Sequence, residues 1–334
     1  MRLSRRVLLA SAAALPLLAT TPLATTDALA ASGELTVYTS QPNEDAQATV
    51  DAFQALHPDV EVSWIRDGTV NVMAKLRAEI AAGAPEADVL LIADTVTMES
   101  LKQEDLLLPH PDADVAAYDA GLYDADKTYF STKLITTGLV HNNDAPTAPA
   151  SWKDLEDPEM QGLIAMPSPL TSGAALIHLA TMVEHPDFGW EHYEALAKNG
   201  VQPQGGNGAT FQAVAGGEKL YGVVIDYLPI REAAKGSPVT FVFPEEGVSA
   251  VTEPVAILSA TDNPEAAKAF VDFLLSRDGQ ELAASQGYLA AHPEVASPDG
   301  FPPLGEITLM PFDAAKALEN DTVYKERFSE LFGG

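Results

Sequence analysis

The chain has 334 residues and is strongly acidic, with a formal net charge of −29 and no cysteine. This charge argues against nucleic acid or an acidic membrane surface as a partner, because their phosphates would be repelled. Without cysteine there are no disulfides, no thiol chemistry and no attachment through a lipidated cysteine. With 46% hydrophobic residues, a chain of this length predicts one large or two medium α/β domains.

The first 30 residues have the pattern of an export signal. A basic region from Arg2 to Arg6 precedes an apolar run, Val7 to Leu18, that is too short to span a bilayer. The small residues of Ala28-Leu-Ala30 offer a cleavage site. The sequence therefore predicts a signal peptide over residues 1–30 and a periplasmic protein without a direct membrane anchor. The general secretory route and the twin-arginine route both fit the pattern.

Three strand–loop–helix units follow the signal. Parallel strands joined by helices form a sheet covered on its faces, so these units predict an α/β sheet. The predicted strands are 34–38, 60–64 and 87–92, and the predicted helices are 43–56, a helix through 72–80 and one carrying Met98 and Leu101. Ligands bind beyond the carboxyl ends of such strands. The residues expected there are Ser40, Gln41, Gly68, Thr69, Asp94 and Thr95.

Two longer strand-like runs predict that the chain crosses between two lobes. Residues 133–140 suit an outward crossover, and residues 251–256 suit the return. A helix over 264–276 would then pack back on the first lobe. We therefore expect an α/β fold with two lobes, mixed and largely parallel sheets, and a hinge of crossover strands. The predicted lobes are residues 34–133 plus 252–300, and residues 134–251 plus 301–334.

The segment Ser168–Ala174 is a candidate anion site. It joins a short apolar strand to an apolar helix, so Thr171 or Ser172 is expected to cap the helix. Gly173 would let a ligand approach the backbone closely. The unpaired N–H groups of the first turn, which continues at Ala174, and the helix dipole favour an anion. A capped helix without a ligand is the alternative interpretation of such a motif.

Six segments of the chain have the pattern of one family: Leu35–Ser40, Ala87–Ile92, Thr171–Ala174, Phe211–Glu218, Asn263–Leu274 and Asp278–Gln280. In these segments the chain resembles the periplasmic substrate-binding proteins of ABC importers. Within that class it is similar to the branch of ferric-ion-binding proteins and their phosphate- and phosphonate-binding relatives. The resemblance implies a two-lobed monomer that captures a small solute and delivers it to a membrane permease.

The family's metal-ligand positions are mostly replaced. The iron-binding members use a histidine, a glutamate and two adjacent tyrosines, where this chain has Pro42, Ala93 and Tyr227 followed by Leu228. Ferric iron favours several hard anionic oxygens together. The resemblance therefore implies that high-affinity iron binding is lost and that only Tyr227 of the four positions still faces the site. No cofactor and no metal are expected.

The family's anion-binding positions are retained, as Ser172, Gly173 and Ala174 with Asn207. An anion pocket without its metal suits a small phosphate ester or a phosphonate. Asp94 and Asp226 are expected to receive an ammonium group, so the favoured ligand is 2-aminoethylphosphonate. Alternatively, Asp94 merely caps a helix and Asp226 faces solvent.

Three other functions have less support from the sequence. A ferric or other metal binder of the same fold remains an alternative, and so does a binder of sugar phosphates or phosphoglycerate. An enzyme is disfavoured, because the chain has no G-x-S-x-G motif, no H-E-x-x-H motif and no cysteine nucleophile. The histidines His178 and His185, seven residues apart on one predicted helix, are expected to pack rather than to ligate.

Overall fold

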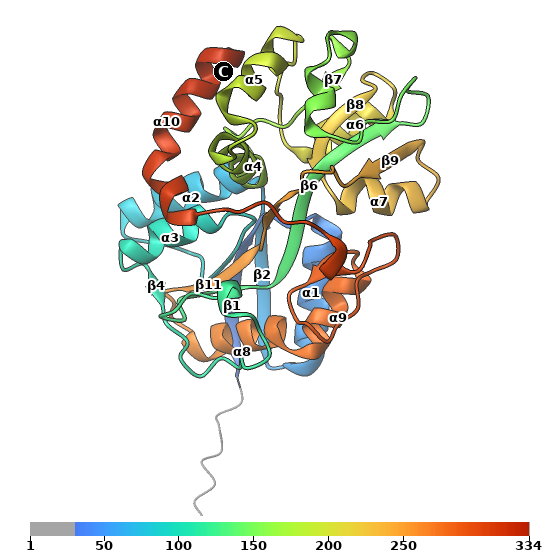
Figure 1. Cartoon of the computed structure of the whole chain (residues 1–334). Helices are drawn as coiled ribbons and strands as arrows, with labels where there is room; N and C mark the ends of the chain where they lie inside the picture. Colours follow the sequence, from blue (N-terminus) through green and yellow to red (C-terminus); the bar gives the residue numbers. More distant parts are fainter. Residues whose placement is uncertain (1–30, 334) are drawn as a thin grey trace, which may run out of the picture. The chain divides into compact units, whose positions relative to one another are not determined.

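A computed structural model describes residues 31–333 of the chain, and the predicted signal peptide lies outside them. Two six-stranded sheets organise the described residues (Figure 1). None of the described helices is both long and apolar enough to cross a membrane. The structure confirms the predicted α/β architecture with two mixed sheets.

The first sheet has the strand order β2-β1-β3-β11-β4, and β5 also pairs with β11. The pairs β1–β2 and β1–β3 are parallel, whereas β11 runs antiparallel to β3. Its strands are β1 (Gly33–Thr39), β2 (Val60–Arg66), β3 (Val89–Leu91), β4 (Leu107–Leu108), β5 (Tyr129–Ser131) and β11 (Pro254–Leu258). The helices of this part are α1 (Asn43–Leu56), α2 (Thr69–Ala82), α3 (Thr95–Gln103), α8 (Pro264–Leu275) and α9 (Arg277–Ser285).

The second sheet has the order β10-β6-β8-β7, and β9 and β12 also pair with β6. Its strands are β6 (Lys133–Asn142), β7 (Ile164–Ala165), β8 (Tyr221–Ile225), β9 (Val239–Val242), β10 (Ser249–Val251) and β12 (Leu289–Ala290). Within this sheet, β7–β8 is the only parallel pair among the described strands, so the expectation of largely parallel sheets holds for β1, β2 and β3 but not for the second sheet. The helices of this part are α4 (Gly173–Glu184), α5 (Gly189–Lys198), α6 (Asn207–Ala215), α7 (Tyr227–Ala234) and α10 (Ala314–Phe332). Short 3₁₀ turns lie at Ala120–Leu122, Trp152–Glu156, Pro158–Met160 and Leu304–Glu306.

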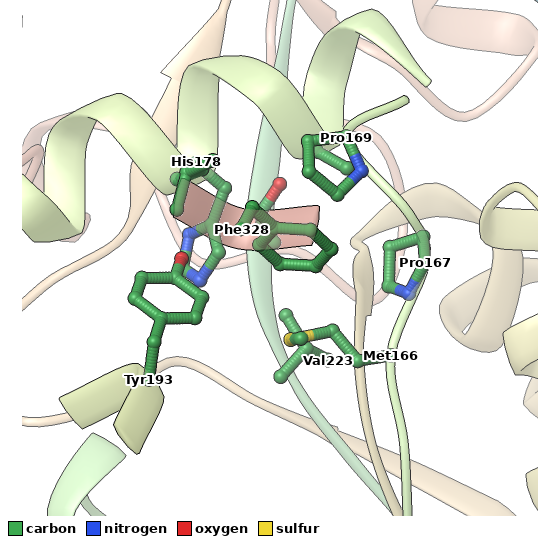
Figure 2. A pocket seen from close by; sticks show the side chains of 10 residues that line it. Met166, Pro167, Pro169, His178, Tyr193, Val223 and Phe328 are labelled. Carbon is green, nitrogen blue, oxygen red and sulfur yellow. The ribbon is translucent and has the colours of Figure 1, made fainter. Parts of the chain in front are cut away.

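Each sheet buries its own apolar core. Phe53 of α1 packs edge-on against Phe270 of α8 beside the first sheet, with ring centroids 5.0 Å apart. In the second part, a void of about 10 Å³ behind α4 is lined by His178, Tyr193 and Phe328 among others (Figure 2). Burial lowers the pKa of His178 to about 3, so this histidine is neutral and packs, as predicted from the sequence.

Two of the connections between the sheets lie side by side. The backbone N–H groups of Thr132 and Lys133 both donate to the carbonyl oxygen of Thr252, at 3.2 and 3.4 Å. The predicted return strand over 251–256 is in fact two strands, because β10 ends in the second sheet and β11 begins in the first. Between them Glu253 has a positive φ of 35°. The hydrogen-bond ladder is interrupted there because the chain changes sheets.

The last helix, α10, also joins the two parts. It packs against α3 beside the first sheet and against α4 and α5 beside the second (Figure 1). An ion pair of 2.8 Å joins Arg327 on α10 to Glu194 on α5. The predicted bounds of the two lobes remain a prediction.

Candidate ligand-binding site

A cavity of about 560 Å³ lies where loops from the two sheets meet. Its lining comes from the ends of β1, β2 and β3, from β6 and β8, and from the residues that begin several helices. The lining residues are Ser40, Pro42, Arg66–Thr69, Asn71, Ala93, Ile135, Thr171, Ser172, Ala174, Gly205–Ala209, Ile225, Tyr227, Leu228 and Glu253.

Five helices begin at this cavity. The residues at their starts that line it are Pro42 before α1, Gly68 before α2, Ser172 before α4, Gly206 before α6 and Tyr227 in α7. The first N–H groups of a helix have no partner within the helix, and the helix dipole places partial positive charge there. The cavity therefore favours an anion locally, in a protein whose net charge would repel one from a distance.

Ser172 and Asn207 tie the starts of α4 and α6 together. The Oγ of Ser172 accepts hydrogen bonds from the N–H of Ala175 at 3.3 Å and from Nδ2 of Asn207 at 3.2 Å. The Oδ1 of Asn207 accepts from the N–H of Ile225 at 3.1 Å, which fixes the orientation of the amide. Because the Ser172 oxygen accepts both of these bonds, its O–H can still donate to a ligand.

Three more of the predicted hydroxyl residues line the cavity, with different capacities. The Oγ of Ser40 accepts from the N–H of Ala93 at 3.0 Å, so the Ser40 hydroxyl also keeps its proton for a ligand. Thr69 is the first residue of α2. Thr171 donates its hydroxyl proton to the carbonyl oxygen of Gly205 at 2.7 Å, and it can therefore only accept.

The two carboxylates expected to hold an ammonium group do not line the cavity. Asp94 is buried and caps α3, accepting from the N–H and the hydroxyl of Thr97. Asp226 is also buried, and it accepts from the N–H and hydroxyl of Thr136 at 2.8 and 2.7 Å and from the N–H of Tyr227 at 2.7 Å. Burial raises the pKa of Asp94, and it raises that of Asp226 to about 7. Both carboxylates are therefore hydrogen-bonded inside the protein. The alternative prediction that Asp226 faces solvent is also wrong, because Asp226 is buried.

Three other predicted residues also lie outside the lining. Gln41 is buried and its Nε2 donates to Glu253 at 3.3 Å, while Thr95 is the first residue of α3. Gly173 packs against other protein atoms and does not face the open cavity. A Cβ placed on it would lie 2.5 Å from the carbonyl oxygen of Ala93. The small size of Gly173 therefore allows the start of α4 to contact the loop after β3.

Arg66, Asp67 and Glu253 line the cavity and were not predicted. The Nε of Arg66 donates to the carbonyl oxygen of Gln41 at 2.8 Å. Arg66 and Asp67 directly precede the expected Gly68 and Thr69 at the end of β2, so the same positional argument could have included them. Glu253 forms a buried 2.7 Å ion pair with Lys133, and nothing in its local sequence pattern indicated that role.

The described residues contain no cluster of three or more histidine, aspartate or glutamate side chains able to hold a metal ion. Tyr227 lines the cavity but lies against Arg231, with the guanidinium carbon 4.6 Å from the ring centroid. Burial raises the pKa of Tyr227, which disfavours the phenolate that a ferric ion would bind. The donor groups at the cavity therefore suit an anion better than a metal.

A family model described as bacterial extracellular solute-binding protein matches residues 35–289. A Haemophilus influenzae protein described as uncharacterized is 31% identical over 284 residues, which are 79% of this chain and 79% of that protein. A Sinorhizobium fredii protein named probable ABC transporter periplasmic-binding protein y4fP is 26% identical over 274 residues, covering 78% of this chain and 75% of that protein.

Among solved structures, the periplasmic binding protein AfuA from Actinobacillus pleuropneumoniae, with exogenous fructose-6-phosphate bound, has a TM-score of 0.82. The match covers 90% of this chain and 99% of that chain, at 23% sequence identity. This similarity confirms the two-sheet fold of periplasmic binding proteins that the sequence led us to expect.

Proposed function

The chain belongs to the family of bacterial extracellular solute-binding proteins, and on that premise we propose that it captures a small organophosphorus anion for an ABC importer. The family binds solutes, and the chain is a binding protein rather than an enzyme. Proteins of this family act outside the cytoplasmic membrane, and we propose that this protein is located in the periplasm. The Sinorhizobium fredii relative, named as a probable ABC transporter protein, supports the link to an importer permease.

The observation that carries the proposal is the arrangement of hydrogen-bond donors around the cavity. The hydroxyl oxygens of Ser40 and Ser172 both accept bonds from the protein, which leaves their protons free to donate to a ligand acceptor. Around them lie the N-terminal N–H groups of α2, α4 and α6. A phosphate or phosphonate group presents three oxygens and two or fewer protons, so it can use many donors at once.

The volume of the cavity supports an organic ligand. A space of about 560 Å³ is in the range of small-molecule sites and exceeds what one inorganic anion would fill. The organophosphorus class includes phosphonates, sugar phosphates and phosphoglycerate. AfuA, which shares the fold, was solved with a sugar phosphate.

The placement of Asp94 and Asp226 weakens the case for 2-aminoethylphosphonate within that class. The ammonium group was assigned to these two carboxylates, and both are buried and hydrogen-bonded inside the protein. We therefore propose the class of small phosphates and phosphonates without an obligatory amine. The two parts built on the two sheets, with the bounds predicted above, would be the lobes that close on this ligand.

Isothermal titration of the purified protein with phosphonates, phosphate esters, inorganic phosphate and ferric iron tests the proposal. We expect at least one organophosphorus compound to bind, and Ser172→Ala and Asn207→Ala each to weaken that binding about ten- to a hundred-fold. This range follows because a hydrogen bond to a charged acceptor contributes roughly 1.5–3 kcal/mol.

Ser276→Ala is the matched control, because Ser276 caps α9 as Ser172 caps α4 but does not line the cavity. It should lower stability by about 1 kcal/mol and leave affinity unchanged. Binding of ferric iron alone, with a visible charge-transfer band and no organophosphorus binding, would contradict the proposal. Equal affinities of the Ser172→Ala and Ser276→Ala variants for the ligand would show that Ser172 is only a helix cap.

A further inference from the structure

Arg66 is the only basic side chain among the residues that line the cavity. It is exposed at the end of β2, and no carboxylate lies within ion-pair distance of it among the described residues. Arg231, which lies against the cavity residue Tyr227, differs in this respect, since it is paired with Asp45 at 2.9 Å. The positive charge of Arg66 is therefore available to a ligand.

The guanidinium of Arg66 is held in place from one side. Its Nε donates to the carbonyl oxygen of Gln41 at 2.8 Å, and Gln41 itself is buried and bound to Glu253. This anchor uses one of the five N–H donors and leaves the two terminal nitrogens unassigned. A planar pair of N–H donors matches the two oxygens of a carboxylate.

We propose that Arg66 binds a second acidic group of the ligand, so that the preferred solute is an organophosphorus anion that also carries a carboxylate. The inference rests on the proposed function, in which Ser172 and Asn207, at the starts of α4 and α6, contact the phosphorus group. Those helices belong with the second sheet, whereas Arg66 comes from a strand of the first. A ligand with an acidic group at each end would contact both parts of the protein.

Two carboxylates also line the cavity, and both have partners. Asp67 accepts from the N–H of Gly68 at 2.6 Å and from Nδ2 of Asn71 at 3.1 Å. Glu253 is paired with Lys133, and the two side chains are buried together. Asp67 is the group that would favour an amine at the second position instead, and the experiment compares the two possibilities directly.

Three phosphonates of similar size separate these possibilities: phosphonoacetate, propylphosphonate and 2-aminoethylphosphonate. They share the phosphorus group and differ in a carboxylate, a methyl or an ammonium at the other end. Titration of the mature protein, without its predicted signal peptide, should give the tightest binding for phosphonoacetate. The variant Arg66→Gln should weaken phosphonoacetate binding about ten-fold or more and leave propylphosphonate binding within about two-fold.

Arg277→Gln is the control for the loss of one positive charge, because Arg277 is exposed and pairs with Glu281 outside the cavity. It should change neither affinity. If 2-aminoethylphosphonate binds more tightly than phosphonoacetate, or if Arg66→Gln weakens all three ligands equally, the assignment of Arg66 is overturned while the proposed function stands. If Ser172→Ala leaves every affinity unchanged, or no phosphonate or phosphate ester binds, the proposed function itself fails and the role of Arg66 fails with it.

Discussion

Arg231 of α7 and Asp45 of α1 form a two-point contact, in which Nη1 and Nη2 of the guanidinium donate to Oδ1 and Oδ2 of the carboxylate at 3.3 and 2.9 Å. The guanidinium also lies over the rings of Tyr227 and Tyr288, at 4.6 and 4.8 Å from their centroids. The hydroxyl of Tyr288 donates to Asp45. The pair joins a helix of the second part to a helix of the first, close to the cavity that Tyr227 lines.

Replacing Asp45 by alanine should lower the free energy of unfolding by roughly 2–3 kcal/mol, because a partly buried guanidinium loses its partner. This loss is smaller than the roughly 3–5 kcal/mol expected when one partner of a fully buried ion pair is removed, because the Arg231 side chain is 24% exposed. Urea unfolding of the two proteins measures the difference. Arg277→Gln, which breaks an exposed pair, should change stability by less than about 1 kcal/mol. Equal losses of unfolding free energy in the two variants would contradict the prediction that the Asp45–Arg231 pair stabilises the protein more than an exposed pair does.

Gly173→Ala should separate the start of α4 from the loop after β3. The added Cβ would lie 2.5 Å from the carbonyl oxygen of Ala93 and 2.9 Å from the Cβ of Asp94, so the backbone must shift. Overpacking of this kind costs about 1–3 kcal/mol. We expect a lower melting temperature and weaker ligand binding.

Gly305→Ala is the control for Gly173→Ala, because nothing lies within 4 Å of the Cβ it would add. It should leave both the melting temperature and ligand affinity close to those of the parent protein. An unchanged ligand affinity in Gly173→Ala would show that the close contact is not needed for the bound state.

The stability of the protein should depend on pH through Asp226. Burial raises the pKa of this carboxyl to about 7 in the folded state, whereas its ordinary value is 3.8. Between these two values the folded protein binds a proton that the unfolded chain does not, so this contribution to stability is present below pH 3.8 and is lost as the pH rises to about 7.

Asp226→Asn removes that titration. The difference in unfolding free energy between the parent protein and Asp226→Asn should therefore decrease from pH 4 to pH 7 and remain constant above it. Chemical denaturation at several pH values measures this difference, in which the titration of the other carboxylates largely cancels. A difference that is constant over the whole range would show that Asp226 is ionised throughout in the folded protein.

The effects of Ser172→Ala and Asn207→Ala should not be additive. Nδ2 of Asn207 donates to Oγ of Ser172 at 3.2 Å, so each variant also disturbs the other side chain. The double variant should lose less binding free energy than the sum of the single losses, with a coupling of about 0.5–3 kcal/mol. Additive losses would show that the two residues contact the ligand independently.

The sequence alone was sufficient to predict the elements that carry the site. Alternating and periodic apolar residues predicted β1, α1 and β2 close to their observed bounds, since local periodicity follows directly from strand and helix geometry. The helix cap at Ser172 was also a local pattern. The starts of these helices could therefore be identified before any tertiary arrangement was known.

The contacts that decide which of those residues face a ligand are set by the tertiary structure. Asp226 follows a strand just as Ser40 does, yet Thr136, 90 residues away in the chain, donates two hydrogen bonds to it and holds it inside the protein. Arg66 faces the cavity because the carbonyl of Gln41, 25 residues away in the chain, holds its Nε. The sequence determined where the strands end and the helices begin, because those properties depend on neighbouring residues. Only the packing of distant segments decided which polar groups are satisfied inside the protein and which remain available to a solute.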